Sequence, residues 1–221
     1  MSTDRLKIYN GALQICELRP IESLTVNEDA RRELDIVWDD GGVEFCLEQA
    51  QWLFARRSGK FTYETGVTPS FGYRRAFAKP VDWLNTAALC TDEYFNQPHN
   101  AFADEGEFWY SDLDVIYVKY TSKDANWGLN LARWVPTFTE YVKMYFASKV
   151  VGKLTSNETL RAAIIKPHTG MLDRALLLAR NKNQMGEPLR YLPAGSWTRA
   201  RTGRSSNTGG YDGGSFHRLI G

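Results

Sequence analysis

Carboxylates are abundant in this sequence and could do chemistry, but they form no recognisable catalytic pattern. Glu64 with Glu107, or Asp112 with Asp114, could in principle supply the acid and base of glycoside cleavage. Such pairs arise by chance in a chain with 26 acidic residues. They therefore give only weak support to a hydrolase.

The three histidines also lack a pattern that would indicate a site. His99, His168 and His217 are far apart and do not have the spacing of metal ligands. The sequence contains no phosphate-binding GxxxxGKS/T or GxGxxG pattern, no HExxH zinc pattern and no GxSxG nucleophile pattern. We therefore expect a protein that is not an enzyme, with no catalytic residue, no metal and no cofactor.

The composition is typical of a soluble globular chain. Of the 221 residues, 43% are hydrophobic, which is enough for a core. The first 20 residues interleave charged and apolar side chains, and no run has the length of a signal-peptide core or a membrane span. Cys16, Cys46 and Cys90 are an odd number without a CxxC pair, as expected of reduced core residues. We expect an intracellular protein without disulfides, zinc or membrane contact.

Residues 188–221 differ sharply from the rest of the chain. They hold seven of the 18 glycines, five arginines, one acid and no lysine, a net charge of +4 against −3 for the remainder. This segment buries too little apolar surface to fold alone, yet tryptophan and arginine are typical of interface hot spots. We predict a C-terminal arm that binds a partner. Its candidate contact residues are Tyr191, Trp197, Arg199, Arg201 and Arg204.

Two other interpretations of the arm stay open. Gly- and Ser-rich chain ends commonly fray in solvent. Alternatively, the arginines could meet phosphates while Trp197 or Tyr191 stacks on bases. The formal net charge of the whole chain is only +1, which argues against nucleic-acid binding as its main role.

Before the arm, helical patterns occupy both ends of the chain. A first helix, capped by Thr3 and Asp4, is expected before Pro20. The run 27–58 has no proline, begins with acids and ends with arginines, which predicts one long helix. Gly41-Gly42 predicts a slight bend within it.

Two apolar faces are expected on the long helix. One face contains Leu34, Trp38, Phe45 and Trp52, and the other contains Ile36, Val43, Leu47 and Phe54. A helix with two apolar faces contacts two neighbours, either inside a helical bundle or across a subunit boundary. The candidate subunit-interface residues are Ile36, Val43 and Leu47.

An acidic stripe runs between these faces and consists of Asp29, Glu33, Asp40, Glu44 and Glu48. Like charges four residues apart on a helix repel one another, so such a stripe is destabilising unless solvent screens it or a function requires it. It is either an ordinary solvated face or a surface kept negative so that nucleic acid slides past it. Asp40, Glu44 and Glu48 are the candidates to face a DNA channel.

The middle third alternates aromatic and polar residues, as strands do. Two strand pairs are expected, 60–68 with 72–77 and 107–110 with 115–120. A turn or short helix is expected at 83–88 and a loop at 96–106.

Helix returns after the strands. It begins at Pro136, a favourable first helical residue. Thr155 and Glu158 have the spacing of a capping box for a last helix, which Pro167 should kink or split and Gly186 should end.

These patterns predict an α+β, mainly α fold. The helical bundle comprises residues 1–58 and 134–187, a small antiparallel β-rich insertion comprises 59–133, and an extended C-terminal arm comprises 188–221.

Several passages together resemble a known family. They are IYNGALQICELRPIESL, FCLEQAQWLFARRS, GYRRAFAKPVDWL, FWYSDLDVIYVKY and FTEYVKMYFASKVVGKLTSNETL. In this order they are similar to tailed-phage head-to-tail adaptors of the tail tubular protein A group, also called gatekeeper or head-completion proteins. The strongest points are Trp52 and Phe54, and the passage with Tyr73, Phe77, Pro80 and Asp82.

The resemblance implies a structural virion protein at the head-tail junction, assembled in the host cytoplasm. It implies a ring, dodecameric in this family, beneath the portal protein, with the arm on portal subunits and the next tail component, a nozzle or tail tube, on the opposite side. DNA would pass through without specific binding. The alternatives are a nucleic-acid-binding phage protein acting through the basic arm, or a tail-associated cell-wall hydrolase.

Overall fold

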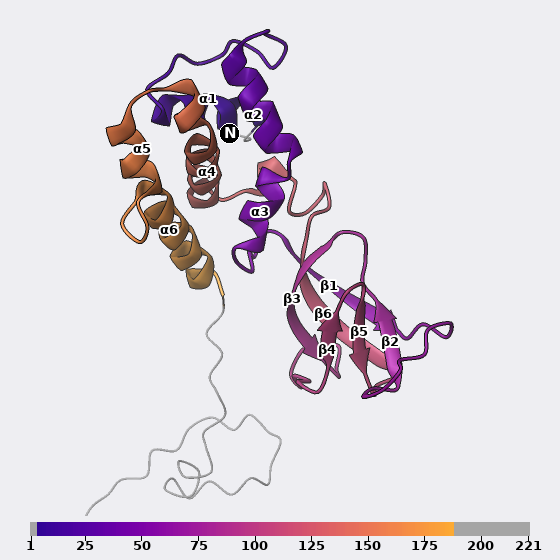
Figure 1. Cartoon of the computed structure of the whole chain (residues 1–221). Coiled ribbons are helices and arrows are strands. Elements are labelled where there is room, and N and C mark those ends of the chain that lie inside the picture. Colours follow the sequence, from indigo (N-terminus) through magenta and orange to yellow (C-terminus); the bar gives the residue numbers. More distant parts are fainter. Residues whose placement is uncertain (1–3, 188–221) are drawn as a thin grey trace, which may run out of the picture. The chain divides into compact units, whose positions relative to one another are not determined.

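The computed structural model of the chain describes residues 4–187. The fold is α+β, with about 40% helix and 19% strand (Figure 1). The helices are α1 (Arg5–Ile15), α2 (Asp29–Asp39), α3 (Gly42–Glu48), α4 (Pro136–Leu154), α5 (Glu158–Ile165) and α6 (Met171–Met185). The strands are β1 (Arg56–Thr62), β2 (Arg75–Ala78), β3 (Trp83–Cys90), β4 (Ala103–Glu105), β5 (Phe108–Ser111) and β6 (Val115–Ser122).

The first helix forms as the sequence predicts. The Asp4 side chain caps it by accepting a hydrogen bond from the backbone N–H of Lys7 at 2.8 Å. Its inner face buries Ile8, Tyr9, Ala12 and Leu13. The three cysteines are buried and free, also as predicted.

The prediction of one long helix over 27–58 is wrong. The α2 helix ends at Asp39, Gly41 takes a left-handed conformation with φ of 79°, and α3 starts at Gly42. A Cβ atom at Gly42 would lie 2.5 Å from the carbonyl oxygen of Val37, so the backbones approach too closely there for any side chain. The two glycines break the helix instead of bending it, and residues 56–58 belong to β1.

The break also removes the two continuous apolar faces. Leu34 and Trp52 are fully buried, as expected of the inner face. Phe45, assigned to the same face, is 44% exposed and stacks on Tyr145 with 4.9 Å between ring centroids.

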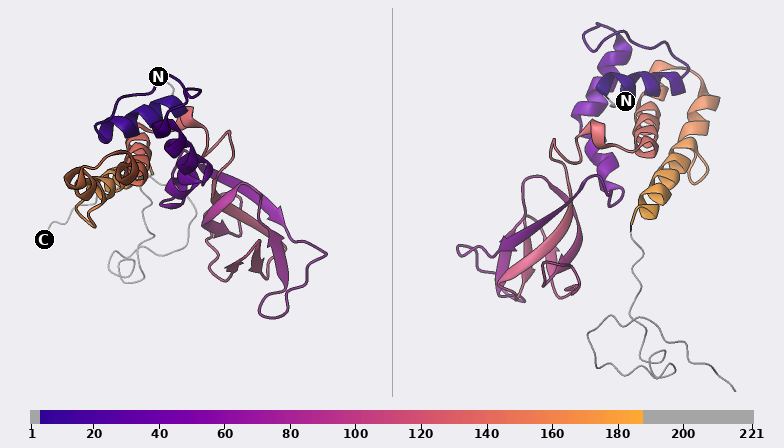
Figure 2. Two further views of the ribbon diagram at one scale, coloured as in Figure 1. Left: turned by 45° about the horizontal axis from the view of Figure 1, so that its top comes forward. Right: turned by 180° about the vertical axis from the view of Figure 1, so that it is seen from behind.

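The α4 helix, predicted from Pro136 onward, is the centre of the helical part. The other helices pack around it, with α2 and α3 on one side and α5 and α6 on another (Figures 1 and 2). Phe138 in its first turn has three aromatic neighbours at 4.7 to 4.9 Å between ring centroids: Trp52, Phe54 and Trp134. Such pairs add to the free energy gained from burial alone.

The expected split near Pro167 is confirmed, since α5 ends at Ile165 and α6 starts at Met171. The prediction that Thr155 and Glu158 form a capping box is wrong. The N-cap of α5 is Asn157, whose side chain accepts a hydrogen bond from the N–H of Leu160, whereas Thr155 ends α4. Asn is as good an N-cap as Thr, and here it is nearer to the first helical turn.

The strands form two antiparallel sheets in place of the two predicted hairpins. One sheet has the order β1-β6-β3 and the other β2-β5-β4. Consecutive strands β5 and β6 therefore lie in different sheets. The residues expected to form a turn or helix at 83–88 form β3, because they pair along β6, and β4 lies within the expected loop at 96–106.

The two sheets share a hydrophobic cluster of their own. Phe77 and Trp109 come from one sheet, and Leu89, Ile116 and Val118 come from the other. A separate and larger cluster occupies the helical part. The β-rich segment therefore has its own core, and its first strand starts at Arg56, three residues before the predicted boundary.

Replacing Trp52 by alanine should cost about 3–5 kcal/mol of unfolding free energy, because it removes a fully buried ring against Phe138. Phe45→Ala is the matched control. It should cost clearly less, since nearly half of the Phe45 side chain is already in water. Denaturant unfolding of both variants makes the comparison, and equal losses would contradict the assignment of Trp52 to the core.

Candidate interaction surfaces

The last turns of α6 are fastened to the segment 49–56, which connects α3 to β1. Arg180 Nη2 donates to the carbonyl oxygen of Gln49 at 2.6 Å. Asn183 donates to the carbonyl oxygen of Gln51 at 2.9 Å and accepts from the N–H of Leu53 at 2.8 Å. One asparagine side chain thus satisfies two backbone groups of a segment that has no regular structure.

Arg56 and Glu187 form an ion pair beside these contacts, with 2.5 Å between Nη1 and Oε1. The Arg56 Nε atom is buried and has no hydrogen-bond partner within the described residues. A cavity of about 380 Å³ opens here, lined by Gln51, Arg56, Arg180, Asn183, Gln184 and Glu187. We call these six residues and Leu53 the arm root, because residue 188 follows directly. The predicted arm contacts at 191–204 lie outside the described residues.

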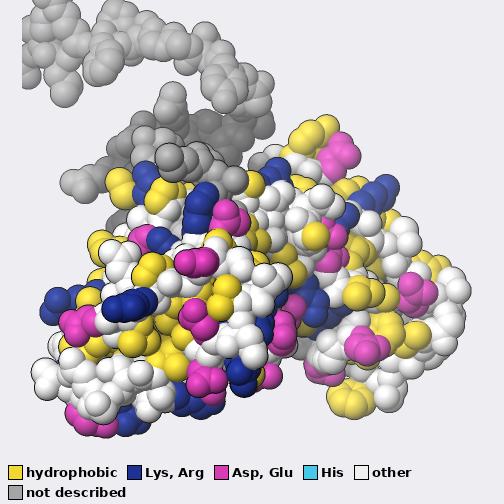
Figure 3. All heavy atoms as spheres, turned by 90° about the horizontal axis from the view of Figure 1, so that it is seen from above, with side chains coloured by type: hydrophobic (Ala, Val, Ile, Leu, Met, Phe, Trp, Pro, Cys, Tyr) yellow, Lys and Arg dark blue, Asp and Glu magenta, His cyan; other side chains and the backbone are white. Residues whose placement is uncertain are grey.

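The acidic stripe is not a continuous acidic surface. Glu33 forms an ion pair with Lys153 at 2.5 Å, and Glu44 lies 3.9 Å from Lys123. Asp40 and Glu48 are exposed, and the helix break at Gly41 separates Asp40 from α3. On the face in Figure 3, acidic and basic side chains are interspersed with apolar ones. The stripe is therefore partly neutralised within the chain itself.

Of the three predicted subunit-interface residues, only Ile36 is on the surface, with 48% of its area exposed. Val43 and Leu47 are buried in the core of their own chain, because α3 turns its apolar side toward α4 after the break. These two assignments are therefore wrong.

Other apolar side chains are more exposed than Ile36. On α6, Leu177, Leu178 and Met185 are exposed by 58%, 62% and 80%. Phe71, Val81 and Tyr94 are exposed in loops beside the strands. An open groove of about 420 Å³ lies between α3, α4 and α6, with Phe45, Tyr145, Lys149, Ile165, Leu172 and Leu176 among its lining residues. Apolar side chains gathered on one surface mark protein contacts.

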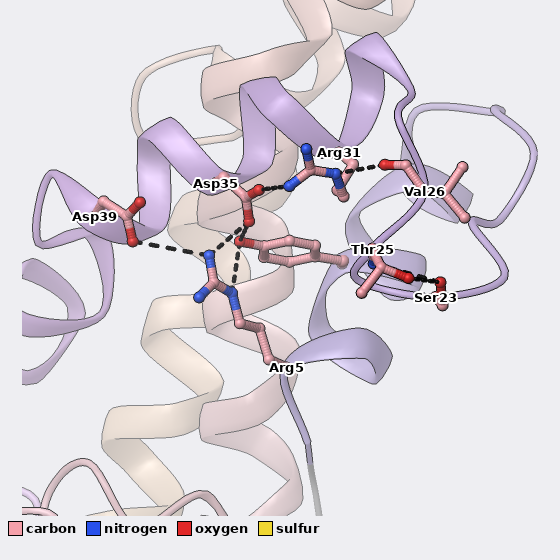
Figure 4. A network of polar contacts seen from close by, with 8 residues as sticks. Arg5, Ser23, Thr25, Val26, Arg31, Asp35 and Asp39 are labelled. Carbon is pink, nitrogen blue, oxygen red and sulfur yellow. Dashed lines mark hydrogen bonds and ion pairs between the residues drawn. The ribbon is translucent and has the colours of Figure 1, made fainter.

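Asp35 connects α2 to α1 (Figure 4). It accepts hydrogen bonds from Arg5 at 2.6 Å and from the Tyr9 hydroxyl at 2.8 Å, and it pairs with Arg31. The Arg5 guanidinium also lies over the Trp38 ring at 4.8 Å from its centroid. Burial, reinforced by Asp35, raises the pKa of Tyr9 well above its usual value. This network stabilises the packing of two helices and leaves no open site for a ligand.

Asp82 makes a similar connection in the β-rich segment. It accepts from Arg57 at 3.0 Å, from the Tyr120 hydroxyl at 3.4 Å, and from Ser122. Burial, followed by the charge of Asp82, raises the pKa of Tyr120 to about 12. The network ties β1 and β6 to the turn before β3.

Two of the four carboxylates considered for catalysis form ion pairs with arginines, and the other two are exposed. Asp112 lies 3.9 Å from Arg74, and Asp114 lies 3.1 Å from Arg75. Glu64 and Glu107 are exposed. His99 shares a 3.1 Å hydrogen bond with Ser111.

Within residues 4–187, histidines, cysteines and acids form no group that could hold a metal ion, and none of the helices combines the length and the apolar character of a membrane span.

No protein-family model matches the chain, and no curated protein sequence is significantly similar to it. The surfaces above therefore have to be interpreted from their own chemistry. The sequence indicated the arm through its composition. It gave no signal for the arm root, because Asn183 and Gln51 are 132 residues apart and are ordinary polar residues in sequence.

Asn183→Ala should lower the unfolding free energy by about 1–3 kcal/mol, because it leaves two backbone groups of the segment 49–56 without their partner. Asn181→Ala, on the exposed side of the same helix, is the control and should change stability by less than about 0.5 kcal/mol. Hydrogen exchange at Leu53 should speed up only in the first variant, and equal protection in both would refute the anchoring role.

Stability should fall as the pH rises from about 10 toward 12, since Tyr120 holds its proton in the folded chain up to about pH 12 but would lose it near 10 when unfolded. The unfolded chain therefore binds fewer protons in this range, which favours unfolding. Tyr120→Phe should make the decline shallower, as measured by chemical denaturation at several pH values. An unchanged slope would contradict the burial of this hydroxyl.

Proposed function

We propose that this chain is a structural virion protein, a head-to-tail adaptor that joins a tailed-phage capsid to its tail. In this proposal the helices form the bundle of such adaptors, and about twelve copies make a ring beneath the portal protein. The C-terminal arm contacts portal subunits, the opposite side of the ring receives the next tail component, and DNA passes through the centre.

The observation that carries the proposal is the arm root. Four polar contacts hold residues 180–187 against the segment 49–56, so the point at which the chain leaves the folded body is fixed. A segment that merely trails in solvent needs no such anchor. An arm that must reach one place on a partner benefits from it, because a fixed origin raises the effective concentration of the arm at its binding site.

Charge supports the same assignment. The arm carries a net +4 and the rest of the chain a net −3. Exposed acids such as Asp40 and Glu48 would keep a channel surface from binding the DNA phosphates. Exposed apolar side chains in the loops and on α6 give the body further surfaces for protein partners.

Nucleic-acid binding through the arm is the second candidate, favoured by the five arginines and the aromatic residues in the segment 188–221. It differs from portal binding in its dependence on salt. Binding that rests on phosphate contacts weakens steeply as the salt concentration rises. Binding through a protein interface centred on Trp197 and Tyr191 depends on those two rings as much as on charge.

The test is co-sedimentation of the full chain with the portal protein of the same virus, at low and moderate salt. The full chain should bind, and a chain ending at Glu187 should remain folded and fail to bind. Trp197→Ala should weaken portal binding at least tenfold, as expected of a hot spot. Thr208→Ala, in the same arm, is the matched control and should bind normally.

Retained binding by the chain that ends at Glu187 would refute the arm's role. Binding to single-stranded DNA that collapses with salt, without portal binding, would favour the second candidate instead. Digestion of cell-wall material by the purified chain would point to the hydrolase alternative.

A further inference from the structure

Two helix faces on this chain are exposed, apolar at their centre and opposite in charge at their edges. The α6 face consists of Arg174, Leu177, Leu178, Lys182 and Met185. The α2 face consists of Ile36, Asp39 and the C-cap residue Asp40. Arg32, one turn before Ile36 on the same side of the helix, is also exposed and pairs with Asp29. Leu177 and Leu178 expose more than half of their surface, which is unusual for adjacent leucines of a helix that packs inward along its other side.

Three of the four charges at the edges of these faces have no ion pair. Among the described residues, no ion pair involves Arg174, Lys182 or Asp40, whereas Asp39 pairs with Arg5 at 3.8 Å. The acidic face and the basic face are therefore electrostatically complementary to each other. Complementary potentials favour one mode of encounter and disfavour like-on-like contact.

A single copy does not bring its two faces together. The α4 helix packs against both α2 and α6, and these two helices lie on different sides of it in both views (Figures 1 and 2). The α2 face and the α6 face also point away from α4, since Leu34 and Ala179 on their opposite sides are buried. Within residues 4–187 neither face therefore meets its complement, and a second molecule can supply it.

We infer that the α6 face of one copy binds the α2 face of a second copy of this chain. The two faces are different, so the contact is heterologous and every copy uses both. A heterologous contact repeats from copy to copy and produces a closed ring or an open filament. The inference deepens the proposed function and rests on it for closure into a ring.

The contact is small, because it involves one side of an 11-residue helix and one side of a 15-residue helix. Interfaces of this kind fall below the area of stable complexes. Free copies should therefore associate weakly and accumulate as rings only where a template holds them close together.

Disulfide trapping tests the contact in the full chain. Ile36→Cys and Leu178→Cys are made separately, mixed at high concentration and oxidised, and the products are separated without reductant. The mixture should give a dimer whose cross-linked peptides join residues 36 and 178. The double variant should give a ladder of trimers and larger species. The three native cysteines are buried, so the parent chain should stay monomeric.

Two further comparisons make the test specific. Val81→Cys, at a fully exposed loop position, replaces Ile36→Cys as the control and should give several-fold less dimer with Leu178→Cys. Adding Lys182→Glu to the Leu178→Cys chain should reduce the 36–178 dimer several-fold. Adding Asp40→Lys to the Ile36→Cys chain as well should restore it.

A 36–178 yield no greater than the Val81→Cys control would overturn the inference, and so would dimers formed by Leu178→Cys alone. Capture of Leu178→Cys by the portal protein or by the segment 188–221, in place of residue 36, would overturn it too. A ladder without portal binding would leave this contact standing and refute the adaptor function. Portal binding without the ladder would overturn this contact and leave the adaptor function standing.

Discussion

The fold depends on the aromatic packing around Phe138 in the first turn of α4. Trp52 and Phe54 reach this ring from the segment that leads into β1, and Trp134 reaches it from the segment that returns from the sheets. Both connections between the helical part and the β-rich segment are therefore fixed at one place in the core. The two sheets can then pack on the cluster that they share, because neither connection has to be ordered by the strands.

For this reason the segment 49–56 has several structural roles. Its inner side supplies Trp52 to the core, its far end becomes β1, and its carbonyl and N–H groups are the partners of Arg180 and Asn183. The end of α6 is thus anchored on a segment that the core itself holds still. An arm that starts from such a point keeps a defined origin, which is what binding to one place on a large assembly requires.

The sequence predicted the elements whose signals are local. Asp4, Pro136 and Pro167 mark the helix boundaries correctly, because caps and prolines act on neighbouring residues. It failed at the helix break and where distant contacts decide. Gly41 takes a left-handed conformation and Gly42 approaches Val37 closely, which ends α2, and β3 forms because it pairs with β6. The burial of Val43 and Leu47 follows from that break, so the interface expected there was lost with it. The composition of residues 188–221 predicts an arm, which lies outside the described residues, whereas no local pattern in the sequence pointed to the arm root.

In the proposed function, many copies of this chain assemble on one portal ring. Light scattering should measure the mass of the purified chain alone and after mixing with a phage portal protein. We expect a small species for the chain alone and, with portal protein, a large complex that gains about twelve chains per ring. A mass that stays the same in the presence of portal protein would refute the proposed assembly.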